Sequence, residues 1–253
     1  MASQIIWLDP NDISFPDTAN AMQDPNGLLA AGGDLSTRRL LHAYQRGIFP
    51  WFSDGQPVLW WTPDPRMVLC PSEIYINRSL RKLAKKHPFS VTVNQCFDAV
   101  ISLCSEPRTI EGQVETGTWI THEVMDAYRA LHQAGFAQSI EAWQDGQLVG
   151  GLYGVALGKI FFGESMFSRV SGASKMAFAT LAQQLQEWDY KLIDCQLDSH
   201  YLASFGSKNV SRNEFENSLR EHIPLNVDEL WLDGAYQPED WCQNWTKPEY
   251  GFD

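Results

Sequence analysis

Apolar residues recur at helical spacing in five segments of the chain, and these segments begin near residues that cap helices. Asp34 or Ser36 precedes the first segment, and Ser211 and Glu214 form a capping box at the last one. These patterns predict helices over residues 36–47, 77–87, 121–135, 171–188 and 211–222.

Shorter apolar segments between the helices predict strands. They cover residues 138–143, 148–156, 159–167 and 192–196. Pro63 and Pro65 interrupt the segment 59–66, so this segment is expected to be extended or at a sheet edge. Three antiparallel strands followed by helix, strand and helix predict an α+β fold with helices packed on a mixed sheet. We expect a small N-terminal domain over 1–70 and a larger domain over 71–253.

The composition is that of an ordinary globular chain, with 44% hydrophobic and 20% charged residues among 253. No apolar run approaches the roughly 18 residues of a membrane span, and the start lacks the basic segment of a secretory signal. A cytoplasmic protein is therefore expected. Five cysteines without Cys-x-x-Cys spacing and six unpaired histidines predict neither a disulfide framework nor a metal site. Dinucleotide, P-loop and Gly-x-Ser-x-Gly motifs are absent from the sequence.

The net charge of −12 repels nucleic acid at long range and attracts basic substrates. One basic cluster, within residues 77–87, departs from this balance, and it is either a solvated helix face or an anion-binding surface. Ten tryptophans are many for this length. They pack in the core or offer rigid faces to bases, sugars or apolar side chains.

Three polar residues could carry chemistry. Asp194 and Gln196 lie two positions apart on an expected strand, so their side chains are expected on one face. A buried carboxylate and amide need partners, which are each other, a ligand, or water at the strand end. Glu164 follows an apolar strand and lies near Met166. Its carboxylate could bind an ammonium group at the rim of an apolar pocket, or it could face solvent from a loop.

Seven sequence blocks together resemble those of the bacterial leucyl/phenylalanyl-tRNA–protein transferases, over residues of about 12–220. The blocks are PNGLLA (25–30), GGDLS (32–36), YQRGIFPWF (44–52), WWTPDPR (60–66), GTWIT (117–121), GESMFS (163–168) and LIDCQ (192–196). The connection 106–115 and the acidic, Trp-bearing tail are longer than in that family.

The resemblance implies an enzyme that transfers Leu or Phe, and also Met, from aminoacyl-tRNA to a protein whose first residue is Arg or Lys. The new N-terminus marks that protein for degradation. A mixed-sheet domain of the acetyltransferase (GNAT) type is implied, after a small N-terminal α/β domain. The aminoacyl ester is already activated, so no cofactor or metal is expected. The expected partners are aminoacyl-tRNA and proteins with N-terminal Arg or Lys, without a membrane, and the chain is expected to act as a monomer.

The resemblance also implies roles for individual residues. Gln196 is expected to position the amine, and Asp194 to take its proton or to stabilise the developing positive charge. Trp51 and Trp119 are expected to sandwich the terminal adenosine, with Tyr128 beside them at the rim of the aminoacyl pocket. The expected pocket residues are Leu152, Glu164, Met166, Phe178, Leu181, Leu185 and Ile193. The expected tRNA phosphate contacts are Arg78, Arg81, Lys82, Lys85 and Lys86.

Two other functions remain open from the residues alone. A CoA-dependent N-acetyltransferase on the same fold needs a pyrophosphate loop, and residues 169–174 supply its Arg and first Gly but not the second Gly. A sugar-binding module would use the tryptophans, but it would not need Asp194 and Gln196 on a buried strand.

Overall fold

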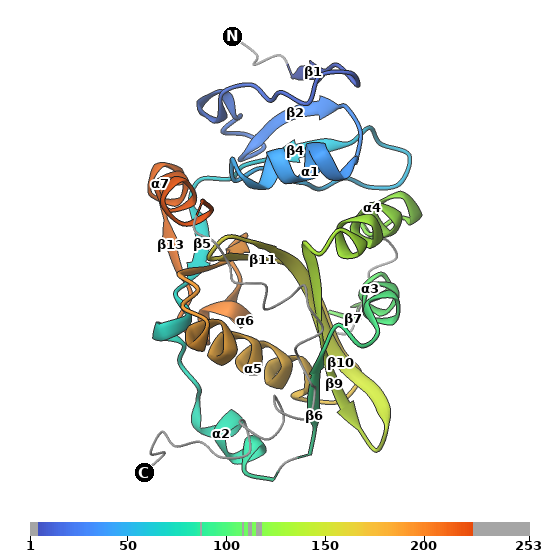
Figure 1. Ribbon diagram of the computed structural model, residues 1–253, viewed down its shortest axis with the longest axis vertical. Coiled ribbons are helices and arrows are strands. Elements are labelled where there is room, and N and C mark those ends of the chain that lie inside the picture. Colours follow the sequence, from blue (N-terminus) through green and yellow to red (C-terminus); the bar gives the residue numbers. More distant parts are fainter. Residues whose placement is uncertain (1–4, 87, 108, 111–112, 115–117, 225–253) are drawn as a thin grey trace.

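The computed structural model describes residues 5–86, 88–107, 109–110, 113–114 and 118–224. A small sheet lies at one end of the molecule and a large sheet fills its centre (Figure 1). The small sheet has the order β1-β2-β4-β3, and only its β1–β2 pair is parallel. Its strands are β1 (Ile6–Leu8), β2 (Leu28–Gly32), β3 (Phe49–Pro50) and β4 (Leu59–Trp61).

The large sheet has seven strands in the order β13-β5-β12-β11-β10-β9-β6. Its β11–β12 pair is parallel and the other pairs are antiparallel. The strands are β5 (Arg66–Leu69), β6 (Ser90–Val93), β9 (Ala137–Gln144), β10 (Gln147–Leu157), β11 (Ile160–Ser168), β12 (Leu192–Gln196) and β13 (Lys208–Val210). A separate hairpin joins β7 (Thr109–Ile110) to β8 (Gln113–Val114).

Helices cover both faces of the large sheet. Alternate residues of its strands enter two buried clusters, so that Leu152 packs on the side of α5 and Tyr153 on the side of α3 and α4. The α-helices are α1 (Thr37–Tyr44), α2 (Arg78–Ala84), α3 (Phe97–Cys104), α4 (His122–Gln133), α5 (Ala173–Glu187), α6 (His200–Ala203) and α7 (Arg212–His222), and the 3-10 turns are η1 (Thr18–Asn20) and η2 (Pro71–Glu73). No helix in the described part of the chain is long and apolar enough to cross a membrane.

The α+β fold class and the five predicted helices are confirmed. The caps explain why, because Ser36, Asn77, Thr121 and Ser211 each accept a backbone N–H at a helix start, and Ser211 and Glu214 complete the capping box. At α5 the helix instead begins after Gly172, which has a left-handed backbone.

Three features differ from the sequence-based expectations. The edge position of segment 59–66 is wrong, because β4 lies between β2 and β3 while Pro63 and Pro65 fall in the connection to β5. Strand β6 and helix α3 were not expected. The strand β5 joins the large sheet from Arg66 onward, inside the range assigned to the small domain. The tail 225–253 and part of the connection 106–115 lie outside the described residues.

Helix α7 returns from the large sheet to the small domain. The Arg212 side chain donates to the carbonyls of Thr62 and Thr18, and the Thr18 hydroxyl donates to Glu216. Apolar residues of α7 close the same contact, since Phe215 and Leu219 approach Gly47 just beyond α1. Contacts between α7, near the C-terminal end of the described chain, and the N-terminal small domain therefore link the two.

Adding a methyl group at Gly47 tests this contact. Gly47 has φ +72°, and a Cβ there would lie 2.9 Å from Phe215 Cε1. Gly55 is a matched control, because it has φ +76° and no heavy atom within 4 Å of the same Cβ. We expect Gly55→Ala to lower the free energy of unfolding by about 1–2 kcal/mol from the left-handed backbone alone. Gly47→Ala is expected to cost about 1–3 kcal/mol more, from overpacking. Equal losses in urea unfolding would contradict this contact.

Candidate active site

A buried ion pair connects β5 and β12, which are neighbouring strands of the large sheet. The Arg66 guanidinium on β5 donates from Nε to Asp194 Oδ1 at 2.8 Å and from Nη2 to Asp194 Oδ2 at 2.6 Å. Their side chains are 1% and 0% exposed. This two-point geometry satisfies both carboxylate oxygens in a place where an unpaired charge would be costly.

The remaining contacts of Arg66 come from three other elements. Its Nη1 donates to the carbonyl of Gly47, and its guanidinium lies 4.7 Å from the ring centroid of Phe49 and 4.6 Å from that of Phe215. Arginine stacks well on aromatic faces because its guanidinium is planar and weakly hydrated. Arg66 therefore connects strand β12 of the large sheet with the small domain and α7.

A β-bulge follows Asp194 on β12 and redirects Gln196. The pairing with β5 shifts between these two residues, and Gln196 has φ +62°. The Gln196 backbone N–H turns back to donate to Asp194 Oδ1 at 2.9 Å. The bulge brings the Gln196 side chain to Glu164, so the simple alternation expected from the sequence does not by itself explain its direction.

Glu164 is the centre of a second polar network. It occupies a bulge of β11, because Tyr153 pairs with Ser165 while Gly154 pairs with Gly163. Gln196 Nε2 and the Tyr44 hydroxyl each donate to Glu164 Oε1 at 2.8 Å, and the Tyr128 hydroxyl lies 2.8 Å from Oε2. The Tyr44 and Tyr128 hydroxyls are 2.5 Å apart.

The surroundings of this network shift its acid–base properties. Burial raises the pKa of Glu164 to about 8, against the hydrogen bonds from Tyr128 and Tyr44, which lower it. Burial and the nearby Glu164 raise the pKa values of Tyr44 and Tyr128 well above 10. Both tyrosines therefore keep their protons at neutral pH.

Six of the seven predicted pocket residues gather on the α5 side of the sheet. Met166 packs against the buried cluster that contains the other five, Leu152, Phe178, Leu181, Leu185 and Ile193. Glu164, the seventh, makes its hydrogen bonds with Tyr44, Tyr128 and Gln196. Two strands link the apolar group with the polar network. Glu164 and Met166 lie two residues apart on β11, and β12 carries both Ile193 and Gln196.

The predicted stacking residues lie on the other side of this network. Trp51 follows β3 and is 42% exposed, and its ring meets the edge of Trp61 at 5.5 Å between centroids. Trp119 precedes α4 and is half-buried against the cluster that contains Tyr44 and Tyr128. Tyr128 is fully buried and engages Glu164 through its hydroxyl.

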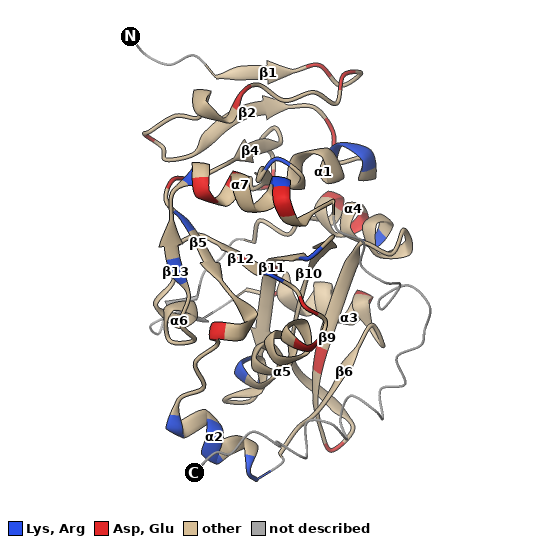
Figure 2. Ribbon diagram, turned by 60° about the vertical axis from the view of Figure 1, so that its left-hand side comes forward, with Lys and Arg blue, Asp and Glu red and all other residues tan. Residues whose placement is uncertain are grey.

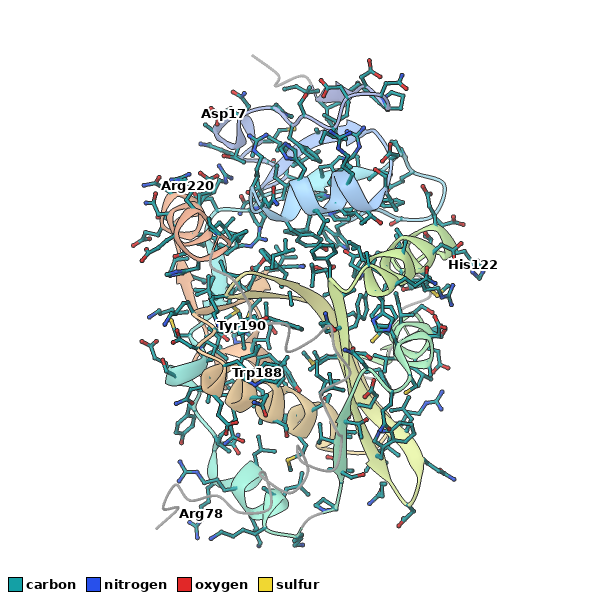
Figure 3. The ribbon with its side chains drawn as sticks, viewed as in Figure 1. Asp17, Arg78, His122, Trp188, Tyr190 and Arg220 are labelled. Atoms are coloured by element: carbon teal, nitrogen blue, oxygen red, sulfur yellow. The ribbon has the colours of Figure 1, made fainter. Side chains whose placement is uncertain are left out.

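The basic residues of α2 lie far from the small domain. Figure 2 shows them at the end of the molecule opposite the small sheet, and Figure 3 places Arg78 there, away from Arg220 on α7. Arg78, Lys82, Lys85 and Lys86 are exposed. Arg81 is half-buried and donates from Nε to the carbonyl of Ile76, so part of its donor capacity is used within the protein.

Sequence reasoning missed two members of the site, Arg66 and Tyr44. Both lie in sequence blocks that carry the family resemblance, and this was the only sign in the sequence that they belong to the site. Their partners are 128 and 120 residues away, so the pairing itself could not be read from the sequence. Among the described residues, no group of three or more His, Cys, Asp or Glu could hold a metal ion.

Family models and curated relatives point to one family. The model for the leucyl/phenylalanyl-tRNA protein transferase matches residues 68–220, and the model for the N-terminal domain of that transferase matches residues 33–64. A leucyl/phenylalanyl-tRNA–protein transferase from Saccharophagus degradans is 51% identical over 248 residues, which is 98% of both chains. One from Teredinibacter turnerae is 57% identical and covers 93% of this chain and 89% of its own.

Breaking the Arg66–Asp194 pair is expected to destabilise the fold strongly. Arg66→Ala and Asp194→Ala should each lower the free energy of unfolding by about 3–5 kcal/mol, because each leaves a buried charge without its partner. The double variant should lose less than the sum of the two, since no charge remains unpaired. The measurement is a double-mutant cycle by urea unfolding.

The exposed pair of Lys208 and Glu73 supplies the control, with both side chains 55% exposed. Its single variants are expected to cost about 0–1 kcal/mol and to add. Additive losses at Arg66 and Asp194 would show that the two residues do not depend on each other.

Proposed function

Because this chain belongs to the leucyl/phenylalanyl-tRNA–protein transferase family and is an aminoacyltransferase, we propose the following reaction for it. It transfers Leu or Phe, and also Met, from aminoacyl-tRNA to the α-amine of an N-terminal Arg or Lys. The neutral amine attacks the ester carbonyl and a peptide bond forms while the ester bond breaks. The proton that the amine loses balances the one that the 3′-oxygen of the tRNA gains as it leaves as a hydroxyl. The activated ester supplies the driving force, so the reaction needs no cofactor.

The network around Gln196 is the observation that carries the proposal. Gln196 Nε2 is held by Glu164, which leaves the carbonyl oxygen of the Gln196 amide to accept an N–H from the attacking amine. Asp194 is buried and its oxygens accept from Arg66 and from the Gln196 backbone, so we assign it a positioning role through Gln196. Holding amine and ester together in one site supplies a large part of the rate gain, about 7–11 kcal/mol at best.

The aminoacyl-tRNA end is bound from both sides of this network. Trp51 and Trp119 stack on the terminal adenosine, a contact of about 1–3 kcal/mol per base that does not depend on net charge. The Leu or Phe side chain enters the apolar group of Leu152, Met166, Phe178, Leu181, Leu185 and Ile193. Glu164 and Tyr128 lie at the boundary, beside the aminoacyl amine.

The remaining surface serves the two macromolecular substrates. Helix α2 contacts tRNA phosphates at a distance from the 3′ end, since it lies at the opposite end of the molecule from the small sheet. The acidic surplus of the chain favours an acceptor that begins with Arg or Lys. The reaction takes place in the cytoplasm, on a monomeric enzyme, and the new N-terminus marks the acceptor for degradation.

One assay tests the reaction directly. The protein is incubated with radiolabelled Leu-tRNA and a protein that begins with Arg, and label in the protein fraction is expected. The same acceptor with an acetylated N-terminus is the control and should stay unlabelled. Labelled acetyl-CoA as the donor tests the N-acetyltransferase alternative. Acetyl transfer in the absence of leucyl transfer would replace the proposal with that alternative.

Gln196→Ala is expected to lower kcat/KM for leucyl transfer by about 100-fold or more, the scale of a lost acid–base or orienting group. The fold should tolerate it, because Gln196 is only half-buried and the Arg66–Asp194 pair stays intact. Gln186→Ala, at an exposed position of α5, is the matched control and should transfer at the wild-type rate. A normal rate for Gln196→Ala would remove Gln196 from the reaction centre.

Neutralising α2 tests its contact with tRNA. The variant changes Arg78, Lys82, Lys85 and Lys86 to Gln and keeps Arg81, whose side chain also serves the fold. We expect weaker tRNA binding and a salt dependence whose log–log slope falls by about 0.7–0.9 for each lost phosphate contact. Lys191→Gln with Lys208→Gln, which removes two positive charges outside α2, is the control for the loss of basic residues elsewhere. An unchanged slope would mean that α2 is only a solvated face.

A further inference from the structure

Three oxygen–oxygen contacts connect Glu164, Tyr44 and Tyr128 in a closed triangle. The Tyr44–Glu164 and Tyr128–Glu164 contacts measure 2.8 Å, and the Tyr44–Tyr128 contact measures 2.5 Å. Each contact needs one hydrogen, because two oxygens without a hydrogen between them repel at such distances. The two hydroxyls supply two hydrogens. The third hydrogen must come from Glu164.

The contact with Gln196 fixes the direction of this ring. Gln196 Nε2 can only donate, so Glu164 Oε1 is the carbonyl oxygen of the acid, and it also accepts from Tyr44. Tyr44 therefore accepts from Tyr128, and Tyr128 accepts from the protonated Oε2 of Glu164. Every hydroxyl in the ring then donates once and accepts once.

We infer that Glu164 is a neutral carboxylic acid within a hydrogen-bonded ring formed with Tyr44 and Tyr128, and that Glu164 takes part in the transfer reaction in this neutral form. The catalytic meaning of this inference rests on the proposed function, whereas the protonation state does not.

The charged groups around Glu164 do not oppose a neutral acid. The ionisable groups that face it are Tyr44 from α1, Tyr128 from α4, Asp194 from β12 and Arg66 from β5, and the last two form a neutral pair. Tyr153 on β10 lies behind the tyrosines. Burial is the largest influence on the Glu164 pKa, and it raises that pKa to about 8. The acid thus stays protonated at neutral pH and ionises as the pH rises through about 8.

A neutral acid has a clear advantage for this chemistry. An α-amine has a pKa of about 8, and it must be unprotonated to attack. In the proposed reaction Gln196 accepts an N–H from the attacking amine, and Gln196 is bonded to Glu164. A carboxylate at Glu164 would therefore lie close to this amine, raise its pKa and favour the unreactive ammonium. The neutral Glu164 offers hydrogen bonds without this penalty. It therefore replaces the carboxylate that the sequence alone led us to expect at this position.

Infrared spectroscopy tests the protonation state without any assay of activity. The difference spectrum between the wild type and Glu164→Gln is recorded from pH 6 to pH 9.5. We expect the carbonyl band of a protonated carboxylic acid at pH 6–7, lost as the pH rises through about 8. A carboxylate band at pH 7 would overturn the inference. Because the readout needs no substrate, a failure of the proposed reaction would not be mistaken for a failure of the ring.

Transfer rates test the working form of the acid. Glu164→Gln keeps a carbonyl and adds an N–H donor, so it can close the same ring without ionising. It is expected to retain most of the rate at pH 7, whereas Glu164→Ala loses about 100-fold or more. The ratio of the Glu164→Gln rate to the wild-type rate should rise above pH 8. A Glu164→Gln rate as low as that of Glu164→Ala would show that the anion is the working form.

Discussion

The Arg66 guanidinium is the interaction on which the site depends. One planar group satisfies both oxygens of Asp194, reaches the carbonyl of Gly47, and stacks between Phe49 and Phe215. A buried charge is tolerable only when all its hydrogen bonds are met, so every one of these elements must be in place at once. The small domain, α7 and β12 are consequently fixed by the same residue. A lysine could not replace Arg66, because an ammonium group can neither donate two parallel hydrogen bonds to one carboxylate nor stack a planar face on aromatic rings.

Two β-bulges bring the polar side chains of the site together. In regular strands the side chains alternate between the two faces of the sheet, so residue number alone would decide which face Glu164 and Gln196 lie on. The extra residue in β11 turns Glu164 toward Tyr44 and Tyr128, and the left-handed turn at Gln196 brings its amide to Glu164. Asp194 stabilises the second bulge by accepting the Gln196 backbone N–H. The ion pair thereby acts on the position of Gln196 through one backbone hydrogen bond.

The sequence predicted the parts of the fold that local interactions decide. The capping side chains of Ser36, Thr121 and Ser211 mark helix starts because they bond within the next turn. Strand β4 was misjudged, since the prolines that follow it lie in a connection whose place depends on distant partners. For the site, Asp194 and Gln196 could be singled out as polar residues that need partners, but Arg66 could not be identified as the partner of Asp194. An arginine in an irregular Pro-rich segment gives no local sign that its partner is 128 residues away.

The charge of the whole chain and the charge of the site have different consequences. At −12 the protein repels nucleic acid at long range, and in the proposed reaction the basic face of α2 and base stacking would supply the attraction to tRNA. Close to the reacting groups the requirement changes, because a negative site would hold both amines as ammonium ions. The Arg66–Asp194 pair cancels one negative charge, and the hydrogen-bonded ring of Glu164 with Tyr44 and Tyr128 removes the other. The two charges therefore act at different distances. The negative charge of the whole chain attracts any approaching basic group, whereas the near-neutral centre leaves an amine at the site free to lose its proton.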